Sequence, residues 1–195
     1  QSTMEAGIEN RTMILFGSDN GPMRNHPVTE FFNSNGDLRG GKRDLYEGGI
    51  RSPLIAYWPS VVPAGTVSDH VCAAWDFFPT FCELADVVVP EGRDGISIVP
   101  ALTGKEQPKH DFLYWEFHGH NAHQTLQAVR MGDWKGVRFK AGGDAEEPIQ
   151  LFNLAEDLGE TKNVADKHPD LVERIGQIMT AEHTPSRIFP FEREQ

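Results

Sequence analysis

Residues 13–22 read MILFGSDNGP, and residues 38–53 read LRGGKRDLYEGGIRSP. In the first stretch, the apolar run 13–16 ends at a glycine and is followed closely by Asp19 and Asn20. An apolar run of this length, closed by turn-forming residues, predicts a buried β-strand. In open α/β sheets, ligands bind just beyond the carboxyl ends of the strands. The sequence therefore places Asp19 and Asn20 where a ligand would bind.

Asp19 and Asn20 offer a carboxylate and an amide carbonyl, two oxygen ligands that suit a hard cation such as Ca2+ or Mg2+. Taken alone, these residues and the following glycine favour a simple turn, because the same residue types dominate turns. The second stretch changes this balance. Its two Gly-Gly pairs, 40–41 and 48–49, permit close backbone approach and enclose a short segment headed by Lys42.

Together the two stretches resemble the pattern S-D-N-G … L-R-G-x-K-x-x-x-Y/W-E-G-G-x-R-x-P of the type I sulfatases, in the alkaline phosphatase superfamily. The likeness is to the C-terminal half of these enzymes, and it is greatest to bacterial members that act on sulfated carbohydrates. It continues through residues 94–104, DGISIVPALTG, and 151–163, LFNLAEDLGETKN, where Leu158 replaces the usual proline. The resemblance implies an α/β fold, with part of a mixed sheet, flanking helices and a small C-terminal antiparallel sheet with a helix.

The resemblance also implies roles for three residues. Asp19 and Asn20 would be two ligands of the active-site cation, usually Ca2+, with Mg2+ as the alternative. Lys42 would be the catalytic lysine that contacts the sulfate group and the leaving oxygen, although a solvated surface lysine is the common alternative. A cation and a lysine near these oxygens would stabilise the charge that develops in the transition state. Three neighbouring charged residues are expected to be structural: Arg39, Glu47 and Arg51.

Histidines in two loops are further candidates. Residues 114–123 read YWEFHGHNAH, and the resemblance suggests that this loop lines the substrate cleft, with His118 as the best candidate for substrate contact. His26 could also reach the substrate, although it fits an ordinary surface histidine as well. A zinc site formed by His118, His120 and His123 is the alternative, but this spacing without a placed carboxylate is only a moderate signal.

The formylglycine nucleophile of the sulfatases arises in a C/S-x-P-x-R motif. Residues 183–187 read HTPSR, so His183 stands where a cysteine or serine is required. Cys72 and Cys82 lack the following proline and arginine, and they are expected to be free thiols because helical spacing would hold them too far apart to bridge. We therefore expect the nucleophile in the N-terminal half of the enzyme, on the same or a partner chain. The 195 residues alone should be inactive.

Composition excludes two classes of partner. The formal net charge of −11 argues against nucleic acid, which requires a basic face. No apolar run approaches the ~20 residues of a membrane-spanning helix.

The first ten residues, QSTMEAGIEN, lack the basic and apolar regions of a signal peptide, whereas the resemblance implies a periplasmic or extracellular enzyme.

Periodicity and turn residues predict the remaining elements and a boundary after residue 105. Residues 1–105 would be the C-terminal part of the catalytic α/β domain, and residues 106–195 an antiparallel sheet with a helix. The expected strands are 53–58, 112–117, 127–130, 134–139 and 149–154, and the expected helices are 79–85 and 168–183.

The function that the resemblance implies is hydrolysis of a sulfate ester, in a sulfated carbohydrate or an aryl sulfate. A phosphoester or phosphonate monoester hydrolase of the same superfamily is one alternative. A non-catalytic fragment that binds sulfated glycans is the other.

Overall fold

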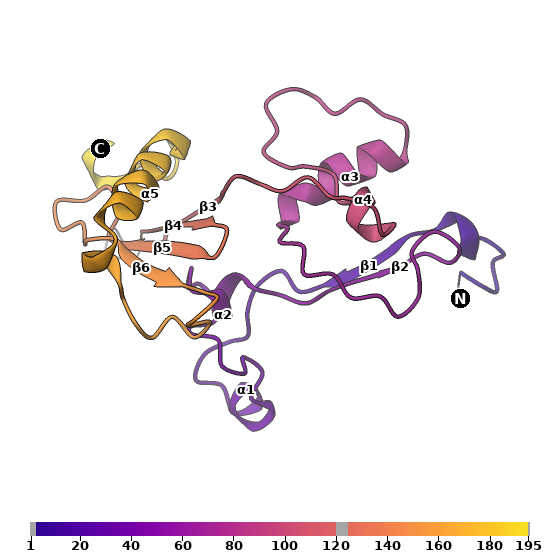
Figure 1. The fold of residues 1–195 in the computed structure, drawn as a ribbon, viewed down its shortest axis with the longest axis horizontal. Coiled ribbons are helices and arrows are strands. Elements are labelled where there is room, and N and C mark those ends of the chain that lie inside the picture. The colour runs from indigo at the N-terminus through magenta and orange to yellow at the C-terminus, as the bar shows by residue number, and fades with distance from the viewer. Residues whose placement is uncertain (1–2, 120–124, 195) are drawn as a thin grey trace. The chain divides into compact units, whose positions relative to one another are not determined.

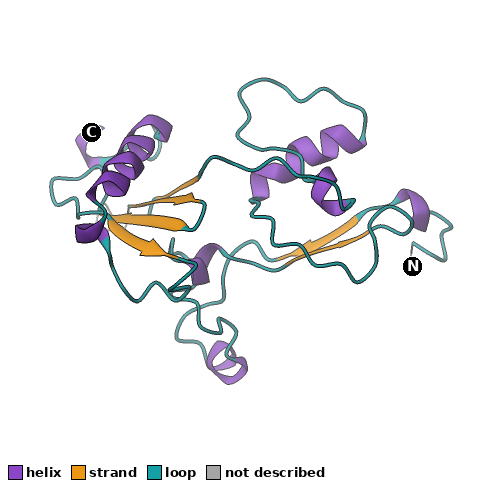
Figure 2. Ribbon diagram, in the orientation of Figure 1, coloured by secondary structure: helices purple, strands orange, loops and turns teal. Residues whose placement is uncertain are grey.

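The computed structural model describes residues 3–119 and 125–194. The chain folds into two compact units, each built from two separate segments. The first unit is Gln1–Gly17 with Pro53–Asp111, and the second is Ser18–Ser52 with Phe112–Gln195. Both units combine helices with antiparallel strands (Figures 1 and 2), in agreement with the predicted α/β class.

The stretch that carries the predicted site belongs to the second unit. Residues 18–52 pack with the C-terminal part of the chain and not with the strands that precede and follow them. The predicted boundary after residue 105 lies near the passage from one unit to the other at Asp111. The division into domains 1–105 and 106–195 stays a prediction about the intact protein.

The first unit is built on a two-stranded ribbon. Strand β1, Ile14–Gly17, pairs antiparallel with β2, Leu54–Tyr57, as two predicted strands. The prediction that β1 is buried is wrong for this chain, since Ile14 is 42% exposed and Phe16 is 65% exposed. Two strands alone cannot bury their side chains, and in the described residues neither helices nor further strands enclose this ribbon.

Four short helices complete the first unit: η1, Glu9–Arg11; η2, Ala74–Asp76; α3, Phe77–Leu84; and α4, Val99–Leu102. Helix α3 begins before the predicted start at Pro79, because a proline is tolerated in the first turn, where its N–H is not needed. Asp76 lies at the N-cap of α3, but its buried carboxylate makes no hydrogen bond to this helix and binds other segments. It accepts hydrogen bonds from the backbone of Ala73 and Ile96 and lies 2.9 Å from Nε2 of His110.

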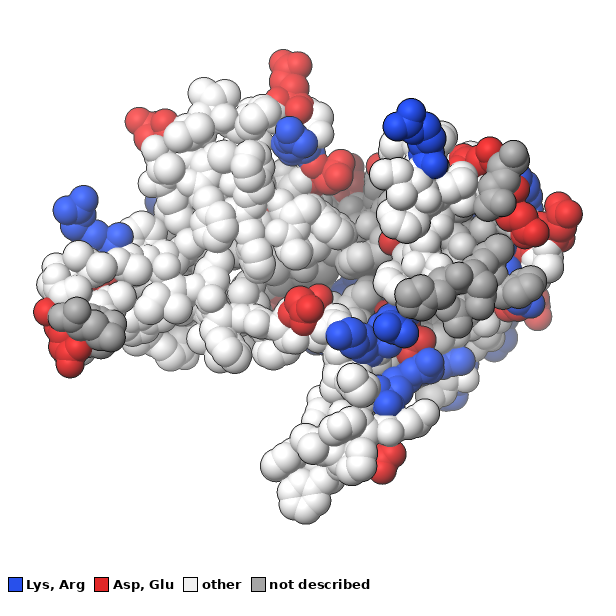
Figure 3. Space-filling view, turned by 180° about the vertical axis from the view of Figure 1, so that it is seen from behind, with Lys and Arg blue, Asp and Glu red and all other residues white. Residues whose placement is uncertain are grey.

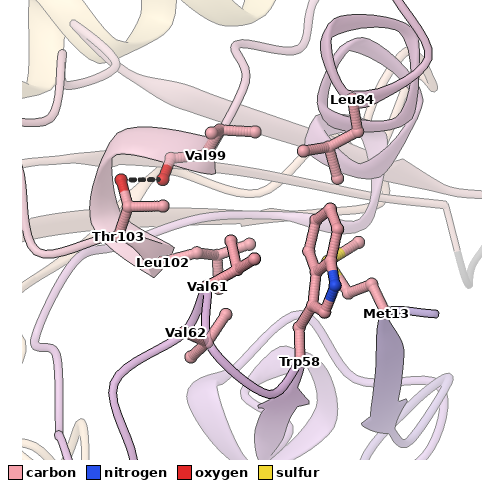
Figure 4. Close-up of a pocket in the computed structure, with 8 residues that line it drawn as sticks. All are labelled: Met13, Trp58, Val61, Val62, Leu84, Val99, Leu102 and Thr103. Atoms are coloured by element: carbon pink, nitrogen blue, oxygen red, sulfur yellow. Dashed lines mark hydrogen bonds between the residues drawn. The ribbon is translucent and has the colours of Figure 1, made fainter. Parts of the chain in front are cut away.

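An apolar pocket lies within the first unit, between the segment that follows β2 and helices α3 and α4 (Figure 4). Its lining residues are Met13, Trp58, Val61, Val62, Leu84, Val99, Leu102 and Thr103. The hydroxyl of Thr103 donates to the carbonyl of Val99 at 2.9 Å, so its polar atom is satisfied locally. The pocket therefore lies among partly exposed apolar side chains, and the two polar side-chain groups of its lining already have partners within the protein.

The second unit contains a four-stranded antiparallel sheet in the order β3-β4-β5-β6. The strands are β3, Leu113–Phe117; β4, Leu126–Met131; β5, Trp134–Phe139; and β6, Gln150–Asn153. The predicted strands 127–130 and 134–139 are confirmed and form a hairpin, because Met131 pairs with Trp134 and only Gly132 and Asp133 lie between them. Gly132 has φ +59°, the left-handed conformation that such tight turns require.

Both faces of this sheet are covered. Helix α5, Pro169–Glu182, confirms the predicted helix and buries Ile175 and Met179 against Val129 and Leu151. On the other side, Leu45 and Tyr46 pack with core residues of the strands: Leu126, Ala128, Val137 and Phe152. The loop that follows Lys42 is thus part of the second unit's hydrophobic core. The remaining short elements are α1, Pro27–Phe32; α2, Glu47–Ile50; η4, Ala165–Lys167; and η5, Glu192–Glu194.

Cys72 and Cys82 are free thiols, as the sequence predicts. Burial, with a contribution from the Asp76 carboxylate, raises the pKa of Cys72. Among the helices of the described residues, none has the length and apolar character needed to cross a membrane.

Candidate functional site

Two loops of the second unit are joined by their backbones. The N–H of Gly21 donates to the carbonyl of Gly49 at 2.8 Å, and the N–H of Lys42 donates to the carbonyl of Pro22 at 2.8 Å. A Cβ atom on Gly21 would collide with the carbonyl oxygen of Gly48. The glycines of the two sequence motifs are therefore needed for this close approach. The loop with Asp19 and Asn20 and the loop with Lys42 form one substructure.

The two predicted metal ligands lie side by side on the first of these loops. Asn20 Nδ2 donates to Asp19 Oδ1 at 2.6 Å, and the Ser18 hydroxyl donates to the carbonyl of Asn20 at 2.8 Å. The first bond uses the side-chain nitrogen of Asn20, so the side-chain oxygen, Oδ1, is left to act as a metal ligand. The exposed Asp19 carboxylate supplies a second one. This donor set fits a hard cation but fills only part of the six to eight positions that Ca2+ takes.

Lys42 is exposed at the head of a tight turn. The turn is closed by a bond from the N–H of Asp44 to the carbonyl of Gly41, and the Asp44 carboxylate accepts the N–H of Gly41 in return, both at 2.9 Å. Arg24 pairs with the same carboxylate at 3.2 Å. The backbone around Lys42 is thereby held at Gly41, Asp44 and Pro22, while the residue itself is exposed.

His26 has a local structural role. Its Nδ1 accepts the N–H of Val28 at 3.3 Å and so caps the short helix α1. His118 follows β3, and its Nε2 lies 2.8 Å from Oε1 of Glu116. In the described part of the chain, no hydrogen bond or ion pair connects either histidine to Asp19, Asn20 or Lys42.

Glu116 is the centre of a polar cluster that the sequence did not reveal. Its two carboxylate oxygens are shared between Nε2 of His118 and Nδ1 of His183, at 2.8 and 2.7 Å, and the Tyr114 hydroxyl also donates to it. His183 stacks on Phe191, with ring centroids 3.9 Å apart. The cluster ties the end of β3 to the segment after α5.

The charges in this cluster shift several pKa values. Burial raises the pKa of Glu116, but the hydrogen bonds from Tyr114, His118 and His183 outweigh burial and hold it below its usual value. Burial lowers the pKa of His183, yet its contacts with Glu116 and Glu194 raise it above the ordinary histidine value. The contacts of this pair therefore favour the ionised carboxylate of Glu116 together with the protonated ring of His183.

A second buried cluster contacts the loop that carries Lys42, residues 39–49, which we call the Gly-rich loop. Lys135 is fully buried on β5, and its Nζ lies 2.7 Å from Oε1 of Glu47 and 3.5 Å from Oε1 of Glu160. Arg130 and Arg51 approach Glu47 Oε2 at 3.4 and 3.8 Å. Burial raises the pKa of Glu160, although the Lys135 charge acts in the opposite direction. The prediction that Glu47 is structural agrees with these contacts, whereas the roles of Lys135 and Glu160 were missed.

The zinc alternative is not tested by the described residues. His120 and His123 lie outside these residues, and His118 is engaged by Glu116. Within residues 3–119 and 125–194, no group of three or more His, Cys, Asp or Glu side chains is arranged to hold a metal. The side-chain oxygens of Asp19 and Asn20 remain the candidate metal ligands of this chain.

Comparison with known proteins gives one family. Residues 40–183 match the model of the family described as N-sulphoglucosamine sulphohydrolase, C-terminal. The steryl-sulfatase of Homo sapiens is 41% identical over 132 residues, covering 65% of this chain and 22% of that protein. A sulfatase of Formosa agariphila is 33% identical over 178 residues, covering 84% of this chain and 30% of that protein.

Solved structures agree with this match. The crystal structure of Ps i-CgsB in complex with k-i-k-neocarrahexaose has a TM-score of 0.74 and 30% sequence identity, covering 92% of this chain and 38% of that one. The chain spans about a third of the length of the relatives it matches. Its two motif loops and C-terminal sheet therefore correspond to one part of a larger molecule in these relatives.

Proposed function

The chain belongs to the sulfatase family whose C-terminal region the matching model describes, and we propose that it forms the C-terminal part of a sulfuric ester hydrolase. The observation that carries the proposal is the backbone bond from Lys42 to Pro22, two positions after Asn20. It holds the lysine loop beside the loop with the two oxygen ligands. The sulfatase names of the relatives favour a sulfate ester over a phosphoester or phosphonate monoester, and over a fragment that only binds sulfated glycans.

Lys42 would act on the charge of the reacting group. In sulfate ester hydrolysis the departing alkoxide gains negative charge, and the sulfuryl oxygens are already anionic. A fixed ammonium group near these oxygens stabilises the transition state more than the ground state. The turn at residues 41–44 holds the backbone of Lys42, so only the side chain has to be ordered when the substrate binds.

Asp19 and Asn20 would hold the active-site cation, Ca2+ or alternatively Mg2+. When bound, such a cation supplies Lewis-acid stabilisation of the sulfuryl oxygens. This chain contributes a carboxylate and an amide carbonyl, so the other ligands are expected in the N-terminal half of the enzyme. The same half is expected to carry the formylglycine nucleophile, and residues 1–195 alone should have no sulfatase activity.

The surface of the first unit supports a partner for this chain. Both strands of its ribbon expose large apolar side chains, among them Ile14, Phe16, Leu54, Ile55 and Tyr57. On the face shown in Figure 3, most of this unit carries no charged side chain. Exposed apolar strands of this kind are association surfaces. We expect the N-terminal half of the sulfatase, on the same or another chain, to cover them.

The substrate is proposed to be a sulfated carbohydrate or an aryl sulfate. One structure at 30% identity holds an oligosaccharide, k-i-k-neocarrahexaose, which supports a sugar sulfate. His118, held by Glu116, and His26, at the start of α1, stay candidates for contact with the rest of the substrate. A periplasmic or extracellular location stays a prediction from the family.

The proposal is tested by the reaction class of the intact protein. The protein that contains this chain is produced together with a formylglycine-generating enzyme and assayed with 4-nitrophenyl sulfate, 4-nitrophenyl phosphate and a phenylphosphonate monoester. A sulfated oligosaccharide is added as a natural-type substrate. We expect Ca2+-dependent release of sulfate and much slower cleavage of the phosphorus esters.

Two outcomes would contradict the proposal. Faster hydrolysis of the phosphate or phosphonate ester would assign the chain to the other reaction of the superfamily. Binding of the sulfated oligosaccharide without turnover, in a protein shown by mass spectrometry to carry formylglycine, would assign it to a non-catalytic binding protein.

A further inference from the structure

Lys135 is an unusual residue for the centre of a small sheet. Its side chain has no exposed surface, and its ammonium group lies between two carboxylates, those of Glu47 and Glu160, which are also fully buried. The three residues come from three separate segments: the Gly-rich loop, strand β5 and the turn after β6. The cluster thus connects the loop that carries Lys42 to the C-terminal sheet.

Glu160 holds the Gly-rich loop at two points. Its carbonyl oxygen accepts a hydrogen bond from Nη1 of Arg39 at 2.8 Å, and its Oε2 accepts the backbone N–H of Glu47 at 2.6 Å. Arg39 also lies over the ring of Tyr46, 3.9 Å from its centroid. Glu160 has φ +51°, a conformation that is costly for a residue other than glycine. Such strain persists where the surrounding structure fixes the residue.

A short series of backbone bonds leads from Glu47 to the candidate metal ligands. Gly48 donates to the carbonyl of Arg39, and the carbonyl of Gly49 accepts the N–H of Gly21, both at 2.8 Å. Gly21 follows Asn20 directly and has no space for a side chain against Gly48. A displacement of residues 47–49 would therefore move the loop that presents Asp19 and Asn20.

Stability alone is a weak reason for this cluster. Burying a lysine and two carboxylates carries a large desolvation cost for each ion, and apolar residues of similar volume often stabilise a core as well or better. The contacts of a charge network are directional, whereas those of an apolar core are not. Each ion therefore fixes the position of its partner. The contacts on Glu47 fix the two ends of the residue, its carboxylate by Lys135 and its N–H by Glu160.

We propose that Lys135 and Glu160 are positioning residues, which set the backbone of residues 47–49 and thereby the geometry of the candidate cation site at Asp19 and Asn20. The inference rests on the proposed function and names further residues for it. Neither residue touches the cation or the substrate, and both act through Glu47 and the Gly21–Gly49 bond. Outer partners of metal ligands commonly change metal affinity or activity by about 10- to 100-fold when they are removed.

The test uses Lys135→Met in the intact protein. Methionine keeps most of the side-chain volume and removes the charge, so no large cavity confuses the result. We measure Ca2+ affinity by calorimetry and kcat and KM for an aryl sulfate, at a temperature where far-UV circular dichroism shows the variant to be folded. The expected result is Ca2+ binding weakened by about 10-fold and a similar fall in kcat, the lower end of the range for outer partners.

A matched control and a second variant accompany it. Lys140→Met makes the same substitution at a partly exposed lysine, whose Nζ lies 2.8 Å from Oε1 of Glu147. This ion pair does not involve residues 39–51. Ca2+ affinity and kcat should therefore stay at the parent values. Glu160→Gln keeps an oxygen that can accept the N–H of Glu47 but loses the charge. It should weaken Ca2+ binding in the same direction by a smaller factor, and it serves as the test if Lys135→Met does not fold.

The outcomes separate this inference from the proposed function. If the parent binds Ca2+ and hydrolyses the sulfate ester, but folded Lys135→Met or Glu160→Gln keeps parental Ca2+ affinity and kcat and loses only thermal stability, the cluster is structural and the inference is wrong. If the parent itself neither binds Ca2+ nor hydrolyses a sulfate ester, the proposed function fails first.

Discussion

The backbone N–H of Lys42 lies 2.8 Å from the carbonyl oxygen of Pro22 and donates a hydrogen bond to it. This bond joins the two loops that carry the candidate cation ligands and the candidate sulfate-binding lysine. A second backbone bond, from the N–H of Gly21 to the carbonyl of Gly49, joins the same two loops. The two bonds hold the candidate cation ligands and the backbone of Lys42 in one substructure, as the proposed reaction requires.

The close packing of these loops predicts a severe effect for Gly21→Ala. The new methyl group would collide with the backbone of Gly48, and backbone atoms cannot move aside as a side chain can. We expect a loss of about 3 kcal/mol in the free energy of unfolding and loss of Ca2+ binding, measured by urea unfolding and calorimetry of the intact protein.

Gly176→Ala is the matched control, because Gly176 lies inside α5 and a methyl group there would be 3.5 Å from Ile149, an ordinary contact. Alanine should stabilise this helix by up to about 1 kcal/mol and leave metal binding unchanged. Equal stability for Gly21→Ala and the parent would show that the two loops do not pack as the structure has them.

If Asp19 and Asn20 are cation ligands, metal binding by the intact protein should depend on these two residues. Asp19→Ala in the intact protein should lose bound Ca2+ or Mg2+ and sulfatase turnover together, because the carboxylate is the charged ligand that this loop supplies. Asp19→Asn keeps an oxygen ligand without the charge and should retain weak binding. Metal content is measured by elemental analysis after dialysis. The control is Asp37→Ala, which removes an exposed carboxylate from the segment between the two loops and should leave the metal content unchanged. An unchanged metal content in Asp19→Ala would rule out Asp19 as a ligand.

The Glu116–His183 pair predicts a pH-dependent stability. The pKa of His183 in the folded protein is raised above its unfolded value of about 6.5, so the stabilisation is complete below that pH and is lost as the pH rises through the raised pKa. The pKa of Glu116 is lowered, so its contribution is present above its unfolded value of about 4.5 and is lost as the pH falls through the lowered pKa. The pair should stabilise most between these limits.

His183→Gln tests this dependence. The difference in unfolding free energy between parent and variant should be about 2 kcal/mol near pH 5.5, on the scale of hydrogen bonds to charged groups, and should shrink at alkaline pH. The control is His168→Gln, since the ring of His168 contacts Trp134 and pairs with no carboxylate in the described residues. A difference that is constant from pH 5 to pH 10 would show that the charge of His183 contributes nothing.

Local sequence signals were sufficient for much of this fold. The hairpin at Gly132 and the helix at residues 169–182 follow from turn residues and apolar spacing, and both are present. The two motif loops could be identified because their glycines leave a dense local pattern. Strand β1 was recognised as a strand, but its burial was not predictable, since burial depends on segments that lie far from it in the sequence or outside this chain.

The parts that sequence reasoning missed depend on pairs of distant residues. Lys135 is separated from Glu47 by 88 positions, and His183 from Glu116 by 67. A lysine in an apolar strand and a histidine after a helix carry no local sign of a buried partner. Glu160 lies in a turn and carries no local sign of its role, although its side chain and backbone hold the Gly-rich loop. Only the arrangement of the sheet brings these charges together.

The most direct measurement is kcat/KM of Lys42→Ala for an aryl sulfate, in the intact, formylglycine-containing protein with saturating Ca2+. We predict a fall of about 100-fold or more, the scale for removal of one preorganised electrostatic donor, with unchanged folding and Ca2+ content. Lys42→Arg should recover only part of the activity, because the guanidinium is larger and planar. Arg43→Gln, which removes the neighbouring exposed charge, should behave as the parent. A folded Lys42→Ala with the parental kcat/KM would contradict the account, because the lysine loop would then play no part in sulfate ester hydrolysis.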